Sequence, residues 1–313
     1  MLGKNAGGLF WMFRYLERSE NAARLIHAGF RMALTSAGAI EDEWKSILVT
    51  AGQDEAYCEK YDSYESANVI DFMLRDRSNP DSVLSVINAA RTNARMVRPN
   101  ITVEVWEATN ECWMELTDLL ARPIKEKNLP EVLGVIRQKS AYVRGALHGT
   151  MLRNDSYNFA RLGTFIERAD NTARILDVKY YVLLPSISMI GSSLDNVQWE
   201  TILRSLSAFR AFSWVNEGEM GPKGIADFLI LDRRLPRSLA FCSEEILGNM
   251  ERLCAEYNEE QRSLALAQEH LSRLKKGKID DVFDAGLHEF LKNFLFENNQ
   301  LAQQIEKDYR FSG

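Results

Sequence analysis

Two segments of the chain carry carboxylates, arginines and an asparagine at helical spacing. Polar side chains stand at i, i+3, i+4 and i+7 counted from Glu17, so on a helix they share one face. Arg18 projects about 100° away from Glu17. Arginine forks can hold carboxylates or phosphates, and a buried glutamate can act as acid or base. The first segment contributes Glu17, Arg18, Glu20, Asn21 and Arg24, and the second repeats it with Glu167, Arg168, Asp170, Asn171 and Arg174.

These ten residues allow two interpretations. In the first, Glu20 pairs with Arg24 at the acid-first i,i+4 spacing, which stabilises a helix by about 0.2–0.5 kcal/mol, and Asp170 repeats this spacing with Arg174. In the second, the two segments meet and line one polar pocket, whose arginines bind the carboxylate of an amino acid or short peptide. Ion pairs between the two segments would offset the free-energy cost of burying these charges, and no ligand would be needed. Both interpretations therefore stay open.

Three blocks of sequence recur in the same order at a nearly constant offset, which indicates a tandem duplication. The duplication predicts a pseudo-twofold arrangement in which residues 9–76 superpose on residues 159–232 and the equivalent first helices meet. We expect one domain over 1–313, with repeat one at about 1–120, repeat two at about 150–260 and C-terminal helices at 261–313. The recurring blocks are 15–25 with 165–175, 44–48 with 199–203, and 71–83 with 227–239.

The elements that position these residues are predicted to be helices throughout. Only seven prolines and eighteen glycines interrupt the chain, and between them apolar residues recur at i, i+3, i+4 and i+7. The sequence therefore predicts an all-α fold, a compact bundle of about twelve helices. We expect these helices at about 9–34, 41–49, 64–76, 82–98, 102–120, 130–148, 155–184, 197–212, 223–231, 238–259, 261–276 and 281–309, with Gly277 as a left-handed stop.

A basic stripe and an acidic stripe lie on either side of the turn at Pro99-Asn100. On an antiparallel helix pair the two stripes could form a ladder of ion pairs, or they could line a groove for a charged substrate. Trp106 and Trp113 lie on another face and are predicted to belong to the core. The stripes consist of Arg91, Arg95 and Arg98, and of Glu104, Glu107, Glu111 and Glu115.

Composition excludes several classes of function. The 313 residues include 38 basic and 44 acidic side chains, a net charge of −6, which gives no basic surface for nucleic acid. The four cysteines form no CxxC pair, and no histidine has a glutamate three residues before it, so we expect neither a zinc nor a di-iron site, and no cofactor. With no stretch long enough to cross a membrane, the chain is predicted to be soluble and cytoplasmic.

The duplicated Glu-Arg motif resembles that of the bacterial alpha-E family. The resemblance spans essentially the whole chain and implies an all-helical protein that occurs beside, or fused to, ATP-grasp peptide ligases and transglutaminase-like cysteine peptidases. It therefore implies a role in making or processing a peptide or amide-linked metabolite. The matching segments are Leu16-Glu17-Arg18-Ser19-Glu20-Asn21, Ala90-Arg91-Thr92-Asn93-Ala94-Arg95, Glu104-Val105-Trp106-Glu107 and Pro236-Arg237-Ser238.

Two hypotheses of function remain from the sequence. In the first, the protein is a binding or scaffold component that works with an ATP-grasp amidoligase and a transglutaminase-like peptidase. In the second, it is an enzyme that acts on their peptide or amide product through the Glu-Arg pocket. The absence of a readable nucleophile and base pair favours the first.

Overall fold

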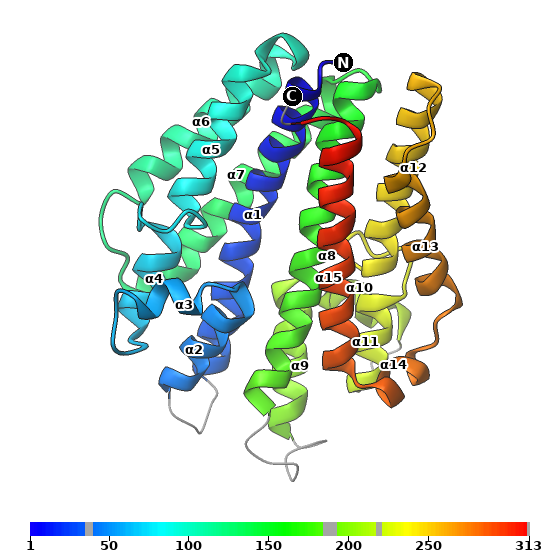
Figure 1. Ribbon diagram of the computed structural model, residues 1–313. Helices are drawn as coiled ribbons and strands as arrows, with labels where there is room; N and C mark the ends of the chain where they lie inside the picture. Colours follow the sequence, from blue (N-terminus) through cyan, green and yellow to red (C-terminus); the bar gives the residue numbers. More distant parts are fainter. Residues whose placement is uncertain (35–39, 184–192, 217–220, 312–313) are drawn as a thin grey trace.

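Two long helices, α1 (Gly3–Ala33) and α8 (Asp155–Leu183), lie side by side at the centre of the molecule (Figure 1). The structure is a computed structural model that describes residues 1–34, 40–183, 193–216 and 221–311. The two helices run in the same direction, since Phe10 contacts Gly163 and, further along, Glu17 contacts Arg168. Their shared interface therefore brings the two Glu-Arg segments together.

The fold is all-α, as predicted, and no strand occurs among the described residues. These residues form fifteen α-helices and two short 3-10 helices, more than the twelve helices expected. Besides α1 and α8, the elements are α2 (Ile40–Ala51), α3 (Asp54–Cys58), α4 (Ser66–Leu74), α5 (Val83–Met96), η1 (Arg98–Asn100), α6 (Val103–Leu119), η2 (Glu126–Asn128), α7 (Leu129–Thr150), α9 (Ser193–Ser205), α10 (Phe209–Val215), α11 (Pro222–Ile230), α12 (Leu239–Tyr257), α13 (Arg262–Lys276), α14 (Ile279–Ala285) and α15 (Leu287–Asp308).

Two of the additional helices arise where residues with positive φ interrupt a long apolar pattern. Ser207, with φ 56°, separates α9 from α10, and Gly286, with φ 94°, separates α14 from α15. Left-handed backbone cannot continue a right-handed helix, whereas side-chain periodicity carries no mark of such a break. The short helix α3 was not predicted. Gly277 was also wrongly predicted, because it is extended at φ −67° and ψ 145°.

The remaining helices cover the central pair from two sides (Figure 1). Helices α5 and α7 pack against α1, and α6 lies against both of them. Helices α12 and α15 pack against α8, with α13 between them, while α2 contacts both central helices. The chain ends meet at one end of the bundle, where a Cβ on Gly3 would lie 2.0 Å from the backbone oxygen of Arg310. None of the helices described has both the length and the apolar character needed to cross a membrane.

The predicted ladder between the basic and acidic stripes is wrong. The guanidinium of Arg91 lies 4.0 Å from the ring centre of Trp113, and that of Arg98 lies 4.6 Å from Trp106. The two tryptophans are partly buried under these arginines. The acidic stripe pairs with a third helix instead: Lys139 on α7 donates to Glu111 at 2.9 Å and to Glu115 at 2.6 Å. Helical spacing alone did not show that α7 would lie beside the acidic stripe.

Several local features recur at positions that the repeated blocks match. Ser82 and Ser238 each cap the helix that follows them. Gly52 has φ 70° after α2, and Ser207 has φ 56° after α9. These pairs fit the offset of the repeats, while the superposition of residues 9–76 on 159–232 stays a prediction.

The close approach of α1 and α8 gives a test of the central interface. A Cβ on Gly163 would lie 2.1 Å from the backbone oxygen of Phe10, so Gly163→Ala must push the helices apart. We expect it to lower the free energy of unfolding by about 1–3 kcal/mol. On α7, where Gly145 has open space, Gly145→Ala should raise it by about 0.5–1 kcal/mol. Urea unfolding measures both, and equal effects would mean that the two helices can separate freely.

Candidate functional site

The two Glu-Arg motifs exchange partners across the α1–α8 interface. Arg168 donates through Nε to Oε1 of Glu17 at 2.8 Å and through Nη2 to Oε2 at 3.0 Å. In the reverse direction, Arg18 donates through Nε to Oε1 of Glu167 at 2.6 Å and through Nη2 to Oε2 at 3.1 Å. Both pairs are bidentate, the strongest geometry for a guanidinium and a carboxylate. Each glutamate therefore pairs with the arginine of the other motif.

One side of this exchange is a closed network of buried charges. Glu17 and Glu20 are each only 1% exposed. Arg144 reaches both of them from α7, and Arg237 reaches both from the turn before α12. Arg24 donates to Glu20 at 2.7 Å and to the carbonyl of Ser205 at 2.6 Å. The closed network consists of Glu17, Glu20, Arg24, Arg144, Arg168 and Arg237.

The closed network holds four guanidinium groups around two carboxylates. Burial alone raises the pKa of Glu17, but Arg168, Arg144 and Arg237 outweigh it and hold this pKa far below its ordinary value. The excess of positive charge has the opposite effect on an arginine. Burial, followed by the nearby Arg24, lowers the pKa of Arg237 to about 10. The carboxylates are thus the scarce partners in this network.

The other side of the exchange opens into a cavity of about 490 Å³, which we call the α1–α8 cavity. Four motif residues, Glu17, Glu20, Arg24 and Arg168, belong to the closed network and do not line it. Both motifs therefore contribute to the cavity, but only with part of their residues. The motif residues that line the cavity are Arg18, Asn21, Glu167, Asp170, Asn171 and Arg174.

Three positive and three negative side chains line the α1–α8 cavity. Arg14 donates to Glu167 at 2.9 Å, and Arg18 also reaches Asp81 at 2.7 Å. Arg174 pairs with Asp170 at 2.6 Å and donates to the carbonyl of Thr50 at 2.8 Å. Charge of both signs thus lines the cavity without a net excess among the described lining residues.

Two buried amides add unfilled hydrogen-bonding capacity to the same cavity. Asn21 and Asn171 are each 5% exposed, and the Oδ1 atom of each has no hydrogen-bond partner among the described residues. The Nδ2 group of Asn21 is occupied, since it donates to the carbonyl of Glu167 at 3.2 Å. A buried carbonyl oxygen without a partner costs free energy. Both amides line the cavity, so a ligand with N–H groups that reached these oxygens would satisfy them.

Acid-base chemistry is disfavoured at the glutamate of this cavity. Burial raises the pKa of Glu167, but Arg18 and then Arg14 outweigh this effect and lower it to about 2. The carboxylate stays ionised at neutral pH, so it neither donates a proton nor accepts one readily. Among the described residues, no group of three side chains suited to a metal ion exists. The cavity presents charged and polar groups.

Sequence reasoning missed several residues of these two arrangements. Arg144 lies on a helix outside both motifs, and nothing in its spacing marked it. Arg237 and Asp81 occupy the middle of two matched triplets, Pro236-Arg237-Ser238 and Pro80-Asp81-Ser82. Their opposite charges are the signal that could have shown that the two sides differ. Likewise, Arg14 directly precedes the matched block 15–25, whereas Thr164 directly precedes the block 165–175.

The fold and the site together define an all-α protein built around a reciprocal, buried Glu-Arg exchange. The chain matches, over residues 1–309, the model of the Alpha-E family, described as a predicted alpha-helical domain with a conserved ER motif. It belongs to this family. A search of the curated proteins found no match, and neither did a search of the solved structures.

The charge excess of the closed network predicts unequal effects of its members on stability. Glu17→Gln leaves four guanidinium groups around one carboxylate and should cost about 3–5 kcal/mol. Arg237→Met removes an excess charge and should cost less, at most about 2 kcal/mol. Urea unfolding measures both variants. A larger loss in Arg237→Met than in Glu17→Gln would contradict the assignment of the carboxylates as the scarce partners.

The depressed pKa of Glu167 predicts a pH dependence of stability. Its ordinary value is about 4.5, and the folded value is about 2. The stabilisation is therefore complete above about pH 4.5 and is lost as the pH falls toward 2, a change of about 3 kcal/mol. Unfolding experiments from pH 6 to 2.5 should show a shallower acid loss in Glu167→Gln than in the wild type. Parallel profiles would show that Glu167 titrates normally in the folded protein.

Proposed function

We propose that this protein is the binding component of a peptide- or amide-forming system and holds a zwitterionic amino acid or short peptide in the α1–α8 cavity. The observation that carries the proposal is the pair of buried Oδ1 atoms of Asn21 and Asn171 without partners in a cavity of balanced charge. The ammonium or amide N–H groups of such a ligand would supply the missing donors.

The charges of the cavity support the rest of the ligand assignment. The side chains of Arg18 and Arg174 are 27% and 32% exposed, so both are within reach of a carboxylate on the ligand. Asp81 and Asp170 lie beside these arginines and complement an amine. A ligand with one charge of each sign keeps the cavity neutral, whereas a simple anion would face three carboxylates.

The proposed partners follow from the resemblance to the alpha-E family. An ATP-grasp-type peptide ligase and a transglutaminase-like peptidase would make and process the ligand, and this protein would hold it or present it between them. We place this activity in the cytoplasm, where the four cysteines, all free in the structure, stay reduced. The alternative of an enzyme acting through the Glu-Arg pocket is less supported, because Glu167 is held ionised by Arg18 and Arg14.

Calorimetry of the purified protein against amino acids and dipeptides tests the proposal. We expect at least one of these compounds to bind. Arg174→Gln should weaken this binding tenfold or more, because the carboxylate of the ligand loses a charged partner. Asn171→Leu should also lose binding. Its melting temperature should stay the same or rise, since an unpartnered buried oxygen is removed.

Arg75→Gln is the matched control. Arg75 also pairs with an aspartate four residues earlier and donates to a backbone carbonyl, that of Leu120, but it lies outside the cavity. It should bind the ligand like the wild type. If no amino acid or dipeptide binds the folded wild type, or if Arg174→Gln binds as tightly, the cavity is not a ligand site of this class.

A further inference from the structure

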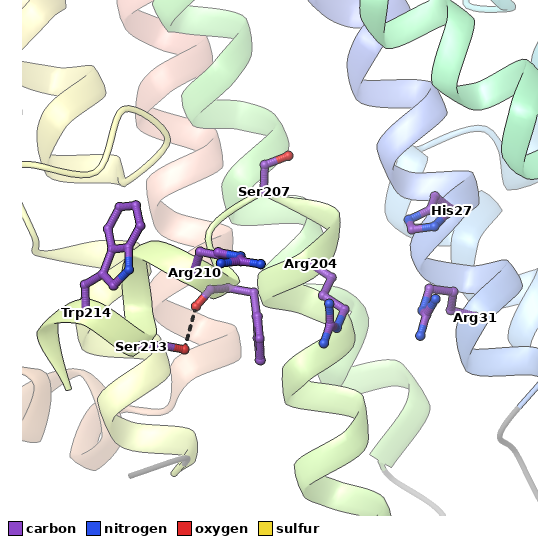
Figure 2. Close-up of a pocket in the computed structure, with 8 residues that line it drawn as sticks. His27, Arg31, Arg204, Ser207, Arg210, Ser213 and Trp214 are labelled. Carbon is purple, nitrogen blue, oxygen red and sulfur yellow. Dashed lines mark hydrogen bonds between the residues drawn. The ribbon is translucent and has the colours of Figure 1, made fainter. Parts of the chain in front are cut away.

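A second cavity, separate from the proposed ligand site, lies between the C-terminal half of α1 and the helices α9 and α10. Its volume is about 600 Å³, and we call it the basic cleft. Figure 2 shows His27 and Arg31 on α1 across the open space from Arg204 on α9 and Arg210 on α10. The residues that line it are His27, Arg31, Arg204, Ser207, Phe209, Arg210, Ser213 and Trp214.

The charge of the basic cleft differs from that of the α1–α8 cavity. Three arginines line it, and none of its described lining residues is acidic. Glu200, one turn before Arg204 on α9, pairs with it at 2.5 Å and offsets one of the three charges. Arg210 has neither an ion pair nor a hydrogen bond with any other described residue. The α10 wall of the cleft therefore carries a guanidinium without a partner among the described residues, and no acidic side chain belongs to the described lining.

The closed network, which contacts the cleft through Ser207, adds to the positive electrostatic potential there. Arg24 belongs to that network and donates to the hydroxyl of Ser207 in the cleft at 2.9 Å. Burial, and then Arg137, Arg31 and Arg24, lower the pKa of His27 to about 4. His27 is thus neutral at physiological pH, and its Nδ1 atom is buried without a partner among the described residues. An anion in the cleft would relieve the repulsion among these groups.

An aromatic side chain stands at the rim of the same cleft. Trp214 on α10 is 79% exposed, and Figure 2 shows its indole beside the α10 wall of the cleft. Large exposed aromatic rings are used for stacking on planar ligand groups, and stacking needs no particular hydrogen-bonding pattern. Arginines on two walls with a nearby aromatic ring fit a ligand that has an anionic end and a planar end.

We propose that the basic cleft binds a small phosphate-bearing ligand, with its phosphates between Arg31 on α1 and Arg210 on α10 and a planar ring against Trp214. Phosphate carries more than one negative charge and accepts hydrogen bonds on several oxygens, so it can use guanidinium groups from both walls at once. A carboxylate carries one negative charge on two oxygens, so it offsets less of the positive charge of the cleft. This site is independent of the proposed amino-acid site, because none of its lining residues lines the α1–α8 cavity.

Calorimetry with inorganic pyrophosphate, ADP, adenosine and succinate tests the proposal. Pyrophosphate should bind, ADP should bind roughly tenfold more tightly because its ring stacks, and adenosine and succinate should bind at least tenfold more weakly than pyrophosphate. Affinity for pyrophosphate should fall as salt concentration rises. In Trp214→Ala, the advantage of ADP over pyrophosphate should disappear while pyrophosphate still binds.

The double variant Arg31→Gln with Arg210→Gln should weaken pyrophosphate binding at least tenfold. Its control is Arg77→Gln with Arg95→Gln, which removes the same charge from exposed arginines outside the cleft. An NMR titration of His27 tests whether pyrophosphate binds in the cleft, because an anion bound there should raise the pKa of His27 above about 4. Equal weakening in both double variants, tight binding of adenosine or succinate, or an unchanged His27 pKa on pyrophosphate binding would overturn the proposal.

Discussion

The structure depends on one electrostatic constraint: carboxylates and guanidinium groups are enclosed together between two parallel helices. A buried charge is tolerated only where a partner replaces the water that it loses. Glu17 and Glu167 meet this condition through Arg168 and Arg18, each supplied by the other motif. The register of α1 against α8 is therefore coupled to the pairing of charges, and Gly163 permits the close approach that this pairing needs.

The two halves of this exchange differ. At one end, Arg237 and Arg144 fill the space beside Glu17 and produce a sealed network. At the other end, Asp81 stands at the position that matches Arg237, and it pairs with Arg18 at the edge of an open cavity. The same motif thus lies in a closed ion-pair network on one side and beside an open cavity on the other. The difference comes from residues outside the motif.

The two cavities differ in the charge of the side chains that line them. The α1–α8 cavity combines arginines and carboxylates and two unfilled amide oxygens, which suits a zwitterion. The described lining of the basic cleft contains three arginines and no acidic side chain, which suits an anion. Arg24 of the closed network donates a hydrogen bond to Ser207 in the cleft. Under the two proposals, one helical core supports two sites of different specificity.

The sequence by itself determined the helical class, most helix positions and the two Glu-Arg motifs, because apolar periodicity and motif spacing are local properties of the chain. It also indicated that charges on these helices must find partners. Only the tertiary structure decided which partners, since Arg144 and Lys139 come from α7, whose neighbours no spacing reveals. The breaks at Ser207 and Gly286 were likewise invisible, because a left-handed residue interrupts a helix without changing its apolar pattern. The separation into a sealed network and an open cavity depends on how α1 and α8 pack, and packing is a property of the whole chain.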